Sequence, residues 1–150
     1  MKLVNYLIAT GLGLGYSPVA PGTAGSLLGI LLMYFLFPFP VWVILLTIIV
    51  LFFLGVYTGT ALEKDHGPDP SKVVIDEIVG MMISLVLVPR IWWMYVVAFL
   101  VFRIFDIVKP PPINASQKLA GGWGIMIDDV LAGFYSLIIM HLILNFLVTP

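Results

Sequence analysis

Long runs of apolar residues, separated by short polar segments, dominate the chain. Residues 41–62 are uncharged and long enough to cross a bilayer as one helix. Further apolar runs cover residues 24–37, 73–88, 91–108 and 125–148. A run over residues 3–15 is too short to span and predicts a short interfacial or re-entrant helix. The pattern therefore predicts an all-α, polytopic membrane helix bundle with about five transmembrane helices, formed by residues 1–150 as one membrane-embedded domain.

Composition supports a membrane protein and excludes several other classes. The chain is 61% hydrophobic and 10% charged, whereas about a quarter of the residues in a soluble domain are charged. The net charge of −1 gives no sign of nucleic-acid binding. The absence of cysteine excludes disulfides, thiolate metal sites and a cysteine nucleophile. No A-x-A-like cleavage site follows the first apolar run, so we expect this run to belong to the mature chain.

Basic residues are distributed unevenly between the two sides of such a bundle. With five crossings, the loops at 63–73 and 109–123 share one side with the N-terminus, and the opposite side has only Arg90. The shared side carries Lys2, Lys64, Lys72, Lys109 and Lys118. Because cytoplasmic loops are enriched in Lys and Arg, we expect this side to face the cytoplasm.

Charged residues within the apolar runs are predicted to meet at one depth. They lie at the ends of three helices that share the cytoplasmic side: Asp76 and Glu77, then Arg103 and Asp106, then Asp128 and Asp129. Asp76 and Arg103 each lie 13 residues from the turn at 89–90, so equal helical rise places them at a similar height.

Small residues follow these acids at helical spacing. The three stripes are Asp76, Gly80 and Ser84; Asp128, Ala132 and Tyr135; and Asp129, Gly133 and Ser136. Since small residues allow close contact between membrane helices, we expect these stripes to face the bundle. The acids then line an internal pocket that opens to the cytoplasm.

The chemistry of such a pocket indicates phosphate binding with a metal ion. Crowded carboxylates need positive charge between them, and Arg103 and Lys109 supply two charges. A divalent cation would supply the rest, and all-oxygen ligands suit Mg²⁺. The candidate metal ligands are Asp76, Glu77, Asp106, Asp128 and Asp129. Together with Arg103 and Lys109, they are also the candidate catalytic residues. Thr23 and Ser26, near a helix start at Pro21, could add hydroxyl and amide donors to the phosphate-binding residues Arg103 and Lys109.

Structural roles are an alternative for individual residues. The helix macrodipole favours an acid at a helix start, which would account for Asp76 or Asp128 but not for Asp106 near a C-terminal end. Arg103 and Asp106 are spaced i, i+3 and could form a structural salt bridge. Adjacent acids project about 100° apart on a helix, so one of each pair could only cap or orient.

Four blocks of the sequence resemble the motifs of the bacterial phosphatidylglycerophosphatase A family. They are SPVAPGTAGSL, DPSKVVIDEIVGM, FRIFDIVKPPPI and GGWGIMIDDVLAGF. The resemblance covers most of the chain and places the motif residues at Pro21, Gly22, Thr23, Ser26, Asp69, Asp76, Glu77, Arg103, Asp106, Lys109, Asp128 and Asp129.

This resemblance implies a Mg²⁺-dependent, multi-pass enzyme of the bacterial cytoplasmic membrane, with its active site facing the cytoplasm. It would remove the terminal phosphate of phosphatidylglycerophosphate to give phosphatidylglycerol. Direct attack by water and a covalent aspartyl-phosphate both remain open, since Asp serves either mechanism.

Two other functions use acids among membrane helices. One is a phosphatidyltransferase, but the DG…AR…G…D…D pattern of the CDP-alcohol enzymes is absent. The other is a cation or proton transporter, in which acids line a path across the membrane. Here the acids lie near one face only.

Overall fold

The computed structural model describes residues 2–67 and 70–148, and within these ranges every regular element is helical. The elements are the helices α1 (Lys2–Ala9), α2 (Pro21–Leu36), α3 (Val41–His66), α4 (Ile75–Ser84), α5 (Trp92–Val108), α6 (Ile113–Ser116) and α7 (Gly122–Val148), and a 3₁₀ turn, η1 (Leu14–Tyr16). The prediction of an all-α bundle is confirmed, with η1 and α1 in the place of the predicted interfacial helix. Asp69, one of the motif residues, lies outside the described residues.

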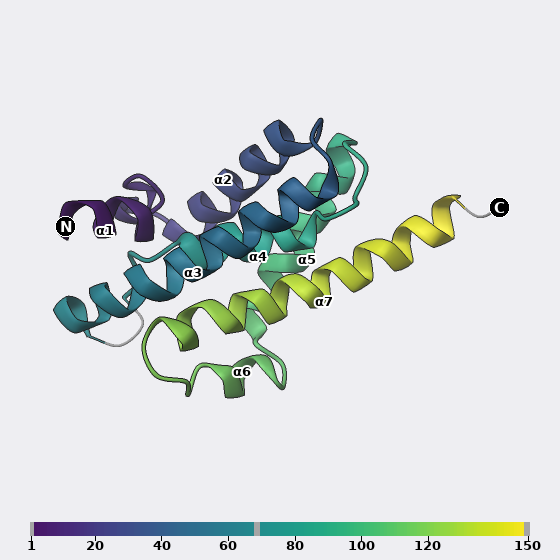
Figure 1. Ribbon diagram of the computed structural model, residues 1–150. Helices are drawn as coiled ribbons and strands as arrows, with labels where there is room; N and C mark the ends of the chain where they lie inside the picture. The colour runs from purple at the N-terminus through teal and green to yellow at the C-terminus, as the bar shows by residue number, and fades with distance from the viewer. Residues whose placement is uncertain (1, 68–69, 149–150) are drawn as a thin grey trace.

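The short helix α4 forms the centre of the bundle, as Figure 1 shows. It contacts α2, α3, α5 and α7, and all of its residues except Glu77 are buried. A helix that is apolar on every side in this way has neighbours on all of its faces. The residues of α4 therefore contact other parts of the protein, whereas the outer helices also have faces that point out of the bundle.

Within residues 2–67 and 70–148, two helices are long and apolar enough to cross a membrane, by length and composition. They are Val41–His66 and Gly122–Leu147, each of 26 residues, with mean hydropathy 2.6 and 2.0. Each measures about 39 Å at 1.5 Å per residue, more than the ~30 Å hydrocarbon core of a bilayer. Their outer faces carry large exposed apolar side chains such as Leu46, Phe53 and Ile138, which suit contact with lipid tails.

About five membrane-spanning helices were expected, and the described residues contain two of sufficient length. The largest difference concerns residues 73–88, which form the 10-residue helix α4 and a turn. At about 15 Å this helix is too short to span alone. It begins at Ile75, directly after Val74, whose N–H donates to the Ala9 carbonyl oxygen at 2.9 Å. It ends before Leu87, whose positive φ of 59° is incompatible with a helix.

Glycines bring the backbones of α4 and α7 into direct contact. A Cβ added to Gly133 would lie 2.5 Å from the Gly80 carbonyl oxygen, and one added to Gly80 would lie 2.6 Å from the Asp129 carbonyl oxygen. Ser84 and Ser136, on the same stripes, are fully buried. The prediction that these stripes face the bundle is confirmed. This crossing places the first turn of α4 beside the early turns of α7.

Candidate active site

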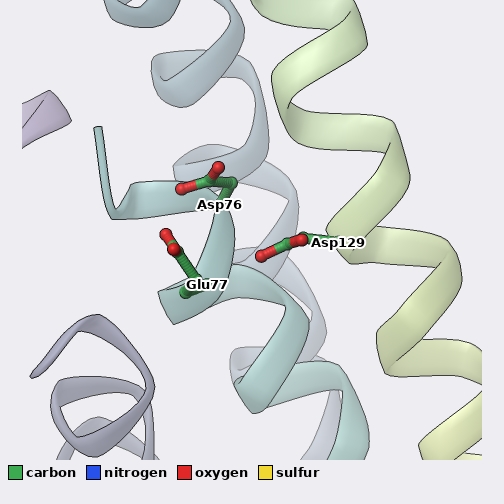
Figure 2. Close-up of side chains that lie close together, drawn as sticks. All are labelled: Asp76, Glu77 and Asp129. Atoms are coloured by element: carbon green, nitrogen blue, oxygen red, sulfur yellow. The ribbon is translucent and has the colours of Figure 1, made fainter. Parts of the chain in front are cut away.

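Three carboxylates meet where α4 crosses α7. Asp76 and Glu77 belong to the first turn of α4, and Asp129 extends from α7 toward them, as Figure 2 shows. One oxygen from each of the three lies within 4.8 Å of the others. The close backbone contact at Gly80 and Gly133 makes this approach possible.

This cluster is buried and incompletely hydrogen-bonded. Asp76 is 8% exposed and Asp129 is 2% exposed. The buried oxygens Asp76 Oδ1, Glu77 Oε2 and Asp129 Oδ2 have no hydrogen-bond partner among the described residues. A buried polar atom without a partner costs about 1–3 kcal/mol, and more for a charged group. Three carboxylates that approach one another so closely, each with a buried oxygen that lacks a partner, fit a bound cation, and a set made only of carboxylate oxygens suits a hard ion such as Mg²⁺.

Arg103 is held at the edge of this cluster by Asp106. The Arg103 Nη1 lies 2.6 Å from Asp106 Oδ2, but this ion pair lacks the alignment of a hydrogen bond, and Nη1 has no hydrogen-bond acceptor. The predicted Arg103–Asp106 pair is therefore present. Its geometry leaves a buried guanidinium N–H able to donate to another acceptor, such as a phosphate oxygen.

Gly22 lets the start of α2 approach both groups. A Cβ at this position would lie 2.4 Å from Glu77 Oε1 and 2.9 Å from Arg103 Nη1. Gly22 thus connects the three-carboxylate cluster with the Arg103–Asp106 pair. The sequence marked Gly22 as part of a helix start and as a residue of the first motif block, without indicating these contacts.

The two predicted hydroxyl donors lie in the first turns of α2. Ser26 is fully buried, and its hydroxyl donates to the Gly22 carbonyl oxygen at 2.9 Å, within its own helix. Thr23 is half-buried, and its N–H donates to the Ala20 carbonyl oxygen at 3.0 Å. Of the two hydroxyls, that of Ser26 is already used to bind the backbone.

Asp128 belongs to a second group, on the loop side of α7. Its Oδ2 forms a hydrogen-bonded ion pair with Lys109 Nζ and accepts from Gln117 Nε2 at 3.2 Å. Its Oδ1 accepts from the Asp129 N–H at 3.0 Å. Asp128 is thus occupied by the segment between α5 and α7, whereas Asp129 faces α4.

Lys109 is a fixed positive charge between two carboxylates. Besides Asp128, its Nζ lies 3.8 Å from Asp106 Oδ1. Burial lowers the pKa of the Lys109 ammonium, but the hydrogen bond and charge of Asp128 outweigh burial and hold this pKa above its usual value. Lys109 also ends α5 at φ 47°, a left-handed conformation that favours glycine.

The structure thus divides the predicted residues into two connected groups. One contains Asp76, Glu77 and Asp129, and the other contains Arg103, Asp106, Lys109 and Asp128. Sequence reasoning missed Gln117, which lies in a loop where no periodicity marks contacts. It also missed the bond from the Tyr135 hydroxyl to the Pro111 carbonyl oxygen at 3.1 Å, although Tyr135 was visible on the Asp128 stripe.

Comparison with known proteins gives concordant matches over nearly the whole chain. The family model described as phosphatidylglycerophosphatase A matches residues 7–144. A protein of that name from Escherichia coli is 40% identical, with 95% of this chain and 86% of the relative covered. The Haemophilus influenzae protein of the same name is 42% identical, with 95% and 91% covered.

Another relative has a different name. A Bacteroides thetaiotaomicron protein, provisionally named a phosphatidylinositol-3-phosphatase, is 46% identical, with 89% of each chain covered. No solved structure shows a significant match.

Proposed function

The chain belongs to the phosphatidylglycerophosphatase A family, and we propose that it removes the terminal phosphate of phosphatidylglycerophosphate, giving phosphatidylglycerol and phosphate. Family membership makes it a phosphatase enzyme. The observation that carries the proposal is the match over residues 7–144 together with a buried acidic cluster flanked by Arg103 and Lys109. Acids and bases in this arrangement suit a phosphate monoester better than an ion path.

Asp76, Glu77 and Asp129 are the residues that would hold Mg²⁺. They have oxygens without hydrogen-bond partners, whereas Asp106 pairs with Arg103 and Lys109, and Asp128 accepts from Lys109 and Gln117. The bound ion would offset negative charge on the phosphate oxygens. The five ligands expected from the sequence are thereby reduced to three.

Arg103 and Lys109 would bind the phosphate oxygens that face away from the carboxylates. The Arg103 Nη1, which makes no hydrogen bond within the described part of the chain, would donate to one oxygen, and Lys109 remains protonated because of Asp128. The first turn of α2, with the Thr23 hydroxyl, would add donors beside Glu77.

Two chemical routes fit these residues. In one, water bonds to phosphorus as the bond to the glycerol oxygen breaks, and a carboxylate accepts a proton of the water and passes it to the leaving glycerol oxygen. In the other, a carboxylate oxygen attacks phosphorus as the bond to the glycerol oxygen breaks, and that oxygen leaves with a proton from water; a second water then cleaves the acyl phosphate to give phosphate and the free carboxylate. Trapping of ³²P on the protein after denaturation would distinguish the second route from the first.

The proposed topology keeps five traversing segments in the bacterial cytoplasmic membrane. The helices α2, α3, α5 and α7 would contact lipid, and α4 with its following turn would pass through their interior, where protein satisfies the backbone of the turn. At one end of the bundle, α1 and the C-terminal end of α3 lie together, joined by a 3.4 Å ion pair between Lys2 and Asp65 (Figure 1). Arg90 lies elsewhere, against the rings of Tyr34 and Phe37. The lysine-rich end, and the acidic site with it, would face the cytoplasm.

A second lipid substrate merits a direct comparison because one relative bears the name of a phosphatidylinositol-3-phosphatase. Purified protein should be given phosphatidylglycerophosphate or phosphatidylinositol 3-phosphate in mixed micelles, and released phosphate measured. We expect faster release from phosphatidylglycerophosphate, loss of release in EDTA and recovery with Mg²⁺. Faster hydrolysis of the inositol lipid would reassign the substrate, and full turnover in metal-free buffer would remove the metal from the proposal.

A further inference from the structure

An apolar groove of about 360 Å³ runs between α3, α4 and α7. Every side chain that lines it is apolar, including Ile48 and Phe52 from α3, Val79 and Ile83 from α4, and Val130 and Phe134 from α7. Phe53 and Phe134 at its opening are 57% and 49% exposed. The groove therefore opens outward between the two helices that are long enough to span a membrane.

One end of the groove adjoins the acidic site. Val79 and Ile83 follow Asp76 at i+3 and i+7, which places all three on one side of α4. On α7, Val130 directly follows Asp129. From there the lining continues seven residues along α7, to Leu137, a distance of about 10 Å away from the acids, and past the end of α4 to Val86 in the following turn.

We propose that this groove binds one acyl chain of the lipid whose phosphate occupies the acidic site, which rests on the proposed function. Along the bilayer normal, a lipid phosphate monoester has its charged head first and its acyl chains next, which is the order of the acidic site and the groove. A wholly apolar lining excludes a polar occupant, because unpaired polar groups there would lose hydrogen bonds. The continuity from Asp76 to Ile83 and from Asp129 to Leu137 assigns the groove to the same lipid as the acids.

The benefit of this contact is orientation. Lipid tails are already in an apolar medium, so a chain gains no hydrophobic free energy by leaving the bilayer for the groove. It gains dispersion contacts with a fixed wall and loses freedom, which places the head over the acids. Filling the groove should therefore slow turnover of long-chain substrates more than it changes their binding.

A matched pair of substitutions on α3 tests this role. Ile48 lines the groove, and Ile44, one turn earlier, lines a separate apolar cavity of about 300 Å³ with Met33 and Leu85. Both isoleucines are 8% exposed, so Ile48→Phe and Ile44→Phe add the same bulk at equal burial. The measurement is kcat/KM for dipalmitoyl and dihexanoyl phosphatidylglycerophosphate.

We expect Ile48→Phe to lower the dipalmitoyl-to-dihexanoyl ratio of kcat/KM by about tenfold, since the loss of about ten atom–atom packing contacts is sufficient for that factor. Ile44→Phe should leave this ratio unchanged. Equal ratios in wild type and Ile48→Phe would overturn the groove as an acyl-chain site. Such a result would leave the proposed function standing, because both substrates would still be hydrolysed.

Cross-linking provides a readout that needs no variant. Wild-type protein in vesicles is illuminated with phosphatidylglycerophosphate that carries a diazirine midway along one chain, and with phosphatidylcholine that carries the same chain. We expect the first lipid to label residues 79–86 and 130–137, and excess unlabelled phosphatidylglycerophosphate to suppress this labelling. Equal, uncompeted labelling by both lipids would identify ordinary bilayer lipid and overturn the proposal, as would an absence of labelling at these residues.

Discussion

Replacing Asp129 by Asn should weaken metal binding and, unusually for an active-site change, leave the metal-free protein no less stable. Asn keeps the size of the side chain but removes one of three negative charges. The three carboxylate oxygens lie within 4.8 Å of one another. At that separation two unit charges repel by about 3 kcal/mol at an effective dielectric constant of about 20. The substitution relieves up to two such repulsions, so the metal-free protein should melt at the wild-type temperature or above it.

With Mg²⁺ the order should reverse. Loss of one strong electrostatic contact typically lowers kcat by about 10²-fold or more. If affinity for Mg²⁺ falls by a similar factor, the ligand-linked stability drops from about 2.7 to about 0.4 kcal/mol at a concentration that is 100-fold above the wild-type Kd. Thermal unfolding in EDTA and in Mg²⁺ measures this directly, without any activity assay. Wild type should gain stability on addition of Mg²⁺, and Asp129→Asn should gain little.

Asp128→Asn is the matched control one residue away. Asp128 interacts with Lys109 and Gln117, so its loss should lower phosphate release without raising the Mg²⁺ concentration needed for half-maximal activity. If instead Asp128→Asn shifts the Mg²⁺ dependence and Asp129→Asn does not, the assignment of the two aspartates is reversed. If neither variant slows phosphate release, the acidic cluster is structural and the proposed site is refuted.

Three further predictions follow from single contacts. Gly22→Ala should retain the fold but lower activity by about 10²-fold, the scale of one lost electrostatic contact, because the added Cβ would displace Glu77 and Arg103. The control is Gly59→Ala, whose Cβ meets only ordinary contacts at 3.4 Å and which should stay active. Activity and circular dichroism are measured for both variants. Gln117→Ala should lower kcat by about 3–10-fold, as expected for a hydrogen bond worth about 1 kcal/mol. Gln117→Glu places a second acid beside Asp128 and should lower kcat further. Equal activity of wild type and both variants would show that the Gln117–Asp128 hydrogen bond is dispensable. Ala115→Cys, an exposed position in a chain without cysteine, should react with an impermeant thiol reagent only after the cytoplasmic side is opened, and labelling in intact cells would reverse the topology.

The sequence predicted the helical class and the meeting of the acids because both depend on strong periodic signals. Small residues at helical spacing after Asp76 and Asp129 correctly marked the faces that meet at Gly80 and Gly133. The length of α4 could not be predicted in this way. Residues 85–88 are as apolar as the helix before them, and hydropathy does not distinguish a buried turn from a helix that continues.

The choice between Asp128 and Asp129 also exceeded what periodicity can decide. Each aspartate is followed by small residues at helical spacing, Ala132 in one case and Gly133 in the other, so both stripes looked suitable for a helix contact. Only the backbone approach at Gly133 shows which stripe meets α4. Gln117 is a different case, because its contact with Asp128 joins a loop to a helix, and loop positions carry no period from which a contact can be predicted.

The start of α7 carries two adjacent acids, Asp128 and Asp129, within an apolar segment because the two side chains have different partners. Because neighbouring side chains diverge by about 100°, α7 can present Asp129 to α4 and Asp128 to the loop before it. The Asp129 N–H donates to Asp128 Oδ1, so the Asp128 side chain is bonded to the peptide that carries Asp129. A movement of Lys109 or Gln117 that displaces Asp128 therefore acts on the backbone that positions Asp129. For this reason Gln117→Ala should change turnover, although no hydrogen bond joins Gln117 to the three-carboxylate cluster within the described part of the chain.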